Sequence, residues 1–225
     1  MSVYKLKIKL LSDTTFGRGD GVAGLVDQEV EHDFCGFPYL RGRTLKGLFS
    51  EECDNLIATL SDRPVRKYWE RVACNLFGKP GSTEETISAM QVGDACLPED
   101  LRQAVAYQMQ LQTNKLTRVD ILESLTVIRR QTAIDTKNGT PDEGSLRSYR
   151  VVLRELEFTA HLSFDAQPSD DTLTLLCIGT LGLQRVGSGR NRGRGYVQCR
   201  LFDYTGKEIT ADYIERFGLA GDAGQ

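Results

Sequence analysis

The sequence predicts an α+β fold, and three observations carry this prediction. Residues 6–10 alternate leucine or isoleucine with lysine, which is typical of a strand with one buried and one solvated face. Residues 155–164 alternate in the same way and place His161 on the polar face. Residues 45–60 and 65–77 instead repeat their apolar side chains at the helical period. Strands and helices are therefore both expected.

Turn and cap residues delimit the other elements. Thr44 is the expected N-cap of the first helix, and Gly78 ends the second. Pro98 begins a shorter helix that extends to about residue 112. A hairpin over residues 27–40 is expected to turn near Cys35 and Gly36.

The order of elements narrows the fold class. Further strands are expected at residues 89–96 and 196–202, a helix at residues 173–183, and a projecting hairpin or loop at residues 128–150. Without insertions the order is β-α-β-β-α-β. This is the ferredoxin-like arrangement of RRM-type RNA-binding domains, here with a helical insertion and a projecting hairpin. We expect a single domain over residues 1–225.

The composition restricts the function. The 225 residues carry a formal net charge of −3, so any affinity for nucleic acid must come from local basic patches. The six cysteines are scattered without a Cys-X-X-Cys pair, so no zinc site is expected. The sequence shows neither a signal peptide nor an apolar run long enough to span a membrane. We therefore expect a cytoplasmic protein without a membrane partner.

The stretch at residues 186–196 interleaves glycines with Arg190, Arg192 and Arg194. Glycine lets the backbone approach a ligand closely, and arginine grips phosphate through two hydrogen bonds. The loop follows a predicted helix and precedes a strand, the reverse of the order in nucleotide-binding loops. The pattern indicates contact with a polyanion; a merely flexible loop is the alternative interpretation.

Two further basic groups point the same way. Arg41, Arg43 and Lys46 crowd a predicted helix N-terminus, where cations are unfavourable unless an anion binds. Arg129 and Arg130 begin the projecting segment, whose basic and aromatic content suits a nucleic-acid backbone. A disordered surface loop is the alternative for that segment.

One segment concentrates acidic residues. Asp27, Glu29, Glu31 and Asp33 alternate, so on a strand they share one face, where they repel unless solvated or neutralised by a cation. A solvated hairpin edge is the alternative. His32 points to the other face.

Three motifs in order resemble the RAMP superfamily of CRISPR proteins, and in particular the backbone subunit of type III effector complexes. They are Phe16-Gly17-Arg18-Gly19 followed by Val26-Asp27 and Asp33, then Gly36-Phe37-Pro38-Tyr39 leading into Gly42-Arg43-Thr44-Leu45-Lys46-Gly47, and finally Arg194-Gly195-Tyr196. The resemblance implies a palm at residues 1–127 and 151–205, a thumb at about 128–150 and a C-terminal tail at 206–225.

The same resemblance implies a function. It implies binding to CRISPR guide RNA and complementary target RNA, alongside copies of this chain, related RAMP subunits and other subunits of an effector complex. It implies that Asp27 cleaves target RNA with Mg²⁺ or another divalent cation, as metal ligand or proton acceptor. The expected RNA-binding residues are Arg18, Arg41, Arg43, Lys46, Arg129, Arg130, Arg190, Arg192 and Arg194.

Two other readings of the sequence remain. One is a structural RAMP subunit that binds guide RNA and neighbouring subunits without cutting. The other is a guide-processing endoribonuclease, which needs a general acid or base such as histidine. Only His32 and His161 are available for that role.

Overall fold

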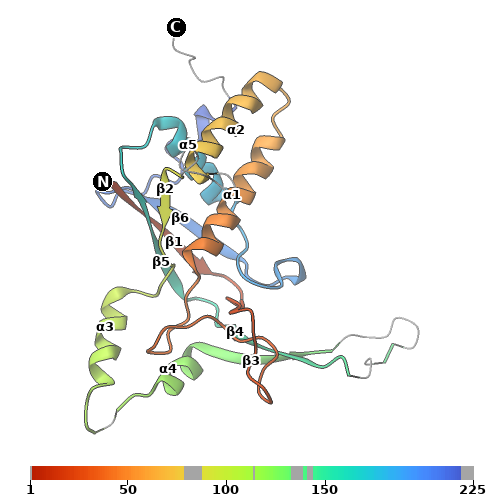
Figure 1. Cartoon of the computed structure of the whole chain (residues 1–225), viewed down its shortest axis with the longest axis vertical. Coiled ribbons are helices and arrows are strands. Elements are labelled where there is room, and N and C mark those ends of the chain that lie inside the picture. Colours follow the sequence, from red (N-terminus) through yellow and green to blue (C-terminus); the bar gives the residue numbers. More distant parts are fainter. Residues whose placement is uncertain (1, 79–87, 114, 133–138, 141–143, 219–225) are drawn as a thin grey trace.

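The computed structural model describes residues 2–78, 88–113, 115–132, 139–140 and 144–218 (Figure 1). Its main sheet contains β1 (Ser2–Leu10), β2 (Met90–Val92), β5 (Glu157–Phe164) and β6 (Val197–Phe202). The strand order is β2-β5-β1-β6, and each neighbouring pair is antiparallel. Helices α1 and α2 lie between β1 and β2 in the chain, and α5 lies between β5 and β6. This β-α-β-β-α-β order confirms the ferredoxin-like prediction.

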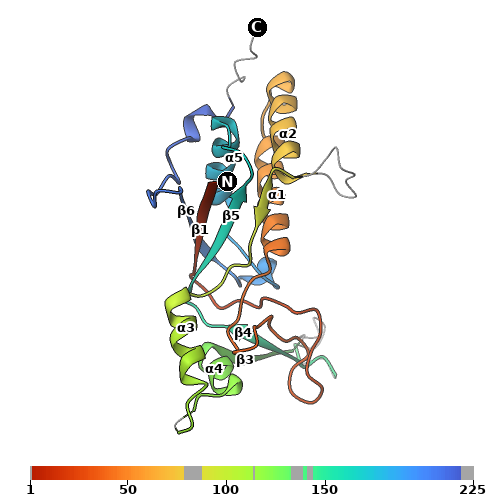
Figure 2. The same ribbon diagram turned by 60° about the vertical axis from the view of Figure 1, so that its left-hand side comes forward.

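One face of the main sheet carries the core. Helices α1 (Gly42–Ala58), α2 (Arg63–Phe77) and α5 (Asp170–Gly182) lie together on one side of the sheet (Figure 2). The apolar side chains of β1 that face them, including Leu6 and Ile8, are buried, whereas Lys5 is exposed on the other face. The alternation of apolar residues and lysines therefore corresponds to the two faces of this sheet.

Helix α1 begins earlier than the sequence predicted. Its N-cap is Arg41, which makes no side-chain cap, and Thr44 already lies inside the helix. The N–H of Gly42 instead donates to the Asp94 carboxylate at 2.7 Å. A Cβ at position 42 would lie 2.1 Å from the carbonyl oxygen of Val92, so the chain passes β2 too closely for any other residue. The prediction of Thr44 as N-cap was wrong because a distant carboxylate caps the helix.

Helix α2 ends as predicted. Gly78 has a φ of +78°, a conformation that L side chains rarely adopt, and its N–H bonds to the carbonyl oxygen of Cys74. At the other end, the Asp62 side chain accepts the N–H of Val65.

An insertion between β2 and β5 forms a second part of the fold. It contains α3 (Glu99–Gln108), α4 (Arg118–Leu125) and an antiparallel hairpin of β3 (Thr126–Gln131) and β4 (Arg147–Val152). Figure 1 shows this hairpin projecting to the side, below the main sheet. The expected hairpin is confirmed at its base; residues 133–138 and 141–143 lie outside the described residues.

The sequence did not reveal α4. This helix begins with a capping box, in which Thr117 and Asp120 each hold the backbone N–H of the other. Its apolar face is short, with Ile121 buried and Leu122 and Leu125 half-buried against the core, so the sequence shows little helical period there.

Residues 27–40 turn where expected but do not form a regular hairpin. The Asp33 carboxylate accepts the N–H groups of Cys35 and Phe37, and Gly36 has a φ of +98°. The arms make isolated bridges, such as His32 with Pro38, and Gln28 lies parallel to Tyr149 on β4. The segment therefore joins the insertion to the main sheet.

Two short 3₁₀ turns complete the described structure, at Arg190–Arg192 and Ile214–Arg216. Within the described residues, no helix combines the length and apolarity needed to cross a membrane.

Candidate nucleic-acid interface

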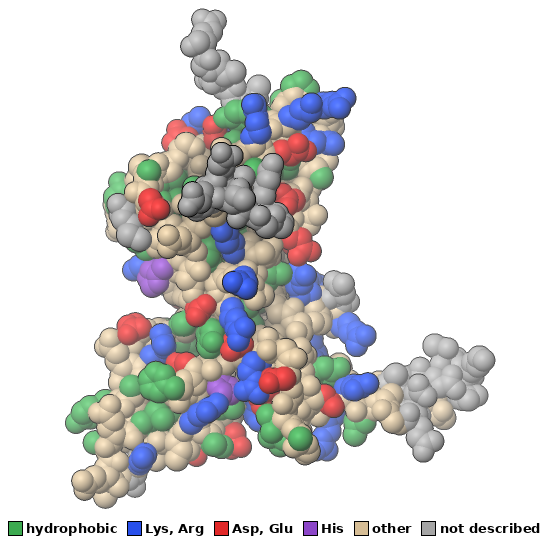
Figure 3. All heavy atoms as spheres, in the orientation of Figure 1, with side chains coloured by type: hydrophobic (Ala, Val, Ile, Leu, Met, Phe, Trp, Pro, Cys, Tyr) green, Lys and Arg blue, Asp and Glu red, His purple; other side chains and the backbone are tan. Residues whose placement is uncertain are grey.

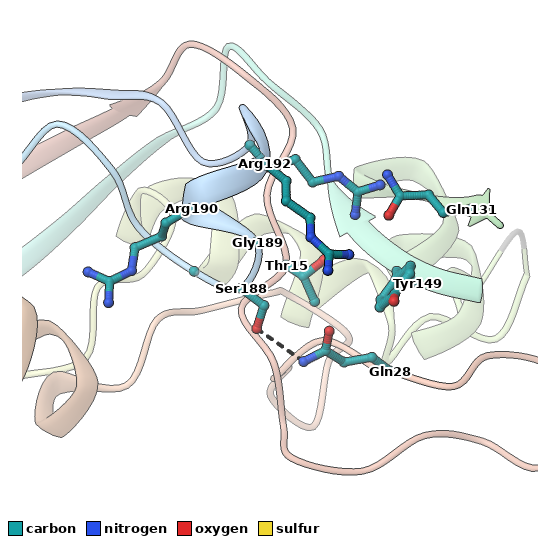
Figure 4. Close-up of a pocket in the computed structure, with 10 residues that line it drawn as sticks. Thr15, Gln28, Gln131, Tyr149, Ser188, Gly189, Arg190 and Arg192 are labelled. Carbon is teal, nitrogen blue, oxygen red and sulfur yellow. Dashed lines mark hydrogen bonds between the residues drawn. The ribbon is translucent and has the colours of Figure 1, made fainter. Parts of the chain in front are cut away.

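A cavity of about 530 Å³ lies where the glycine-rich loop meets the β3–β4 hairpin. Arg190, Arg192 and Arg194 of the loop line it. Figure 4 shows Thr15, Gln28, Gln131 and Tyr149 around the same space, contributed by three other segments of the chain. A concave site lined by three arginines suits a ligand with several negative charges.

Two further cavities adjoin this one. The first shares Gly187, Ser188 and Arg190 and continues to Arg41 at the start of α1. The second shares Gln131, Tyr149 and Arg192 and continues along the hairpin to Arg147. We call the three together the arginine groove. Its arginines are Arg41, Arg147, Arg190, Arg192 and Arg194.

The glycines of the loop are required by its path. Gly187, Gly189, Gly193 and Gly195 all have φ values between +71° and +81°. At Gly195 a Cβ would also lie 1.9 Å from the carbonyl oxygen of Val186. The loop therefore folds back tightly and directs its arginines outward from a constrained backbone.

Neighbouring groups orient the arginines. The Arg194 guanidinium lies 5.4 Å from the ring centre of Tyr149. Arg190 pairs with Glu51 of α1, Nη1 to Oε2, at 3.2 Å. Both contacts are partly solvent-exposed, so an incoming phosphate can compete for these guanidinium groups.

The start of α1 differs from the open anion site that the sequence predicted. Arg41 forms an ion pair with the buried Glu31 at 2.8 Å. The first N–H of the helix is taken by Asp94. Lys46 donates to the carbonyl oxygen of Met90, and burial lowers its pKa, while Arg43 is exposed. Internal carboxylates thus occupy part of the space where a phosphate was expected.

The four alternating acids separate in the structure. Glu29 pairs with Arg150 at 2.8 Å, Glu31 with Arg41, and Asp33 with Arg102 at 3.3 Å. The prediction that they share one face was wrong because residues 27–33 do not form a regular strand. Among the described residues, no group of three or more His, Cys, Asp or Glu side chains is arranged to hold a metal.

Asp27 alone of these acids is exposed. Its Oδ2 accepts the N–H of Ser148 at 2.6 Å and the Ser148 hydroxyl at 3.1 Å. The backbone hydrogen bond from Ser148, followed by that from its hydroxyl, holds the pKa of Asp27 below its usual value. Asp27 is therefore an ionised carboxylate fixed against β4, directly before Gln28 of the arginine groove.

The remaining predicted residues lie at the edges. Arg18 pairs with Asp20 at 2.6 Å, and Arg129 pairs with Asp13 at 3.0 Å. Arg129 is opposite Tyr149 in the hairpin register, whereas its neighbour Arg130 is opposite Ser148 and so faces the other side. The hairpin therefore presents Arg129 and Arg130 to different surroundings.

Sequence reasoning missed four polar residues of the central cavity, namely Thr15, Gln28, Gln131 and Ser188. Gln28 and Ser188 are hydrogen-bonded at 3.0 Å although 160 positions separate them in the chain. The only available signal was the position of Gln28 beside Asp27 and of Ser188 between two glycines.

Positive charge also gathers over the face drawn in Figure 3. Lys and Arg side chains follow one another down the middle of this face, from the main sheet towards the insertion. The overall charge of −3 thus coexists with a local basic band, as a polyanion-binding surface requires.

Comparison with known proteins identifies the family. No curated protein matches the chain significantly. A chain of the type III-B Cmr-beta complex in its apo state, solved by cryo-EM, superimposes with a TM-score of 0.64 at 15% identity, covering 88% of this chain and 96% of that one. A chain of Cmr-beta bound to cognate target RNA gives a TM-score of 0.63 at 13% identity, with coverage of 88% and 96%.

These likenesses show a shared fold. The RAMP superfamily model matches residues 7–198, which run from the second half of β1 through the arginine-rich loop to the start of β6. The chain therefore belongs to the RAMP superfamily.

Proposed function

We propose that this chain is a guide-RNA-binding backbone subunit of a type III CRISPR effector complex. Its partners are the guide RNA, the complementary target RNA, copies of itself or related RAMP subunits, and other subunits of the complex. The family and the likeness to two chains of Cmr-beta complexes support this class. Sequence is then read by base pairing between guide and target, while the protein holds the backbone.

The arginine groove is the observation that carries the proposal. Five arginines from the N-cap of α1, from β4 and from the glycine-rich loop line one continuous concave surface. Phosphate groups spaced along a strand can each meet a guanidinium there, and Tyr149 offers an aromatic face. No small anion needs so extended a site.

We further propose that Asp27 takes part in cutting the target RNA. It is exposed, ionised and held by Ser148 next to the groove. In cleavage of this class the 2′-oxygen loses its proton and attacks the adjacent phosphate in line, while the bond from phosphorus to the 5′-oxygen breaks and that oxygen takes up a proton from water. This requires the backbone to be held in one geometry. The groove arginines would supply that positioning.

The available side chains could hold Mg²⁺ only if RNA phosphate oxygens supplied the other ligands. Asp27 offers Oδ1, since Ser148 holds Oδ2, while Glu29 and Glu31 are already neutralised by arginines. Mg²⁺ is commonly bound through one or two carboxylates plus phosphate oxygens of the substrate. A bound Mg²⁺ would neutralise charge on the scissile phosphate.

A reconstituted complex tests both proposals. The complex with guide RNA is offered labelled complementary RNA in Mg²⁺, and wild type is compared with Asp27→Ala and with Asp20→Ala. Asp20 is a matched control, because it is another exposed acid of the same loop. We expect regularly spaced fragments from wild type and Asp20→Ala, and none from Asp27→Ala, with target binding equal in all three.

The other outcomes separate the two proposals. Undiminished cutting by Asp27→Ala would refute the role of Asp27. Tight target binding without cutting in every variant would identify a structural subunit, the alternative favoured by the pairing of the other three acids. Failure of the complex to bind guide RNA would refute the backbone assignment.

A further inference from the structure

We propose that the arginine groove selects RNA over DNA, and that the side-chain amides of Gln28 and Gln131 make this selection by bonding ribose 2′-hydroxyls. This inference rests on the proposed function, since it assumes that the groove binds a nucleic-acid backbone. The groove would then recognise the ribose as well as the phosphates.

The lining can accept a hydrogen bond from the ligand as well as donate to it. Phosphate oxygens only accept hydrogen bonds, and the arginines provide donors for them in excess. A glutamine amide also carries a carbonyl oxygen, which repels phosphate and needs a donor. Along a nucleic-acid backbone, the 2′-OH is the group that both donates and accepts, and DNA lacks it.

Gln28 is held ready for such a contact. Its Nε2 donates to the Ser188 hydroxyl at 3.0 Å, and its backbone carbonyl accepts the N–H of Arg150 at 3.0 Å. Among the described residues, no donor bonds its side-chain carbonyl oxygen. The half-buried side chain therefore keeps an acceptor available on the wall of the cavity (Figure 4).

Gly17 makes room for this amide. A Cβ at position 17 would lie 2.7 Å from Nε2 of Gln28 and 3.1 Å from the Ser188 hydroxyl. The φ of Gly17 is not positive, so alanine strains no backbone there. Gly17→Ala is therefore a way to displace the Gln28 amide without removing it.

Gln131 contributes a second amide from the hairpin. It lies opposite Arg147 in the β3–β4 register and lines both the central cavity and the one along the hairpin. Figure 4 shows Gln131 and Gln28 on different walls of the same space, with Tyr149 and Arg192 between them. The groove therefore offers amide groups as well as guanidinium groups to a ligand.

The test compares the affinity of the full chain for RNA and for DNA of one sequence, at one salt concentration. The variants are Gln28→Leu, Gln131→Leu and Gly17→Ala, with Gln198→Leu as control, because Gln198 is exposed on the main sheet. We expect wild type to prefer RNA. Each groove variant should weaken RNA binding by roughly two- to ten-fold, the net value of one hydrogen bond, and leave DNA binding unchanged.

A second measurement separates the loss of one contact from a general loss of binding. RNAs that carry single 2′-deoxy substitutions are bound to wild type and to Gln28→Leu. We expect the loss at sensitive positions to disappear in Gln28→Leu, since the partner of the missing hydroxyl is already gone.

The outcomes keep this inference distinct from the proposed function. Equal wild-type affinity for RNA and DNA, or a preference unchanged in all three groove variants, would overturn the inference while leaving the groove a nucleic-acid site. Absence of any binding to RNA would overturn the proposed function as well.

Discussion

The ion pair between Glu29 and Arg150 is the main constraint on the acidic loop. The two side chains are 3% and 8% exposed, with Nε and Oε1 at 2.8 Å. The same Oε1 accepts the N–H of Val30, and Arg150 also donates to the Thr126 hydroxyl. A buried pair with these additional bonds fixes the loop against β4, and with it the backbone of Asp27 and Gln28.

Glu29→Ala should therefore destabilise the protein strongly. It leaves Arg150 charged, buried and unpaired, so we expect the free energy of unfolding to fall by about 3–5 kcal/mol. Urea denaturation measures this loss. Asp20→Ala, which removes an exposed partner of Arg18, should change the free energy of unfolding far less. Equal losses in the two variants would contradict the assigned role of the buried pair.

The pKa of Asp27 gives a second prediction for a single residue. The N–H of Ser148 is the largest cause of the lowered pKa, ahead of the Ser148 hydroxyl. Ser148→Ala keeps the N–H, so the pKa should rise but stay below its usual value in an NMR titration of the metal-free protein. Because the folded pKa lies below the unfolded value of about 3.9, the stability contributed by Asp27 is present above that pH and lost as pH falls through the folded pKa. A normal pKa for Asp27 in wild type would contradict the hydrogen bonds from Ser148.

In the packing of helices, two glycines differ in the space that surrounds them. Gly179 of α5 faces α1, where a Cβ would lie 2.7 Å from Sγ of Cys53 and 3.1 Å from the ring of Phe49. Gly47 of α1 is exposed, and a Cβ there would meet no heavy atom within 4 Å. The same substitution therefore has opposite physical consequences in the two helices.

We expect Gly179→Ala to lower the free energy of unfolding by about 1–2 kcal/mol, because overpacking outweighs the gain in helix propensity. Gly47→Ala should raise it by about 0.5–1 kcal/mol, since alanine restricts the unfolded chain without a clash. Thermal and urea denaturation of both variants provide the measurement. Stabilisation by Gly179→Ala would show that α1 and α5 lie farther apart than described.

Elements were predictable from sequence where local pattern decides them. The alternation at residues 155–164 and the Gly78 stop both correspond to observed boundaries. The start of α1 was not predictable, because Asp94 caps Gly42 from 52 positions away. Helix α4 was not predicted because it is only eight residues long, so its apolar face consists of Ile121, Leu122 and Leu125 alone.

At the scale of the whole molecule, the groove exists only because separate segments meet. The sequence pointed to Arg190, Arg192 and Arg194 through composition alone, and these arginines line the central cavity. It did not point to Gln28 or Gln131, since a lone glutamine carries no pattern. Pairing of the acids with arginines was likewise invisible, because register and burial decide it.

The central claim is that the arginine groove binds RNA through its phosphates. The most direct measurement is the salt dependence of RNA binding for wild type, for the combined Arg190→Gln, Arg192→Gln and Arg194→Gln variant, and for a matched control. The control is Arg63→Gln, Lys67→Gln and Arg71→Gln, which removes three exposed charges from α2.

Each phosphate contact to a single strand contributes about −0.7 to the slope of log K against log salt. We therefore predict that the groove variant binds more weakly and that its slope is smaller in magnitude by about 2, while the control keeps the wild-type slope. A groove variant with the wild-type slope, or a control that loses as much, would contradict the claim.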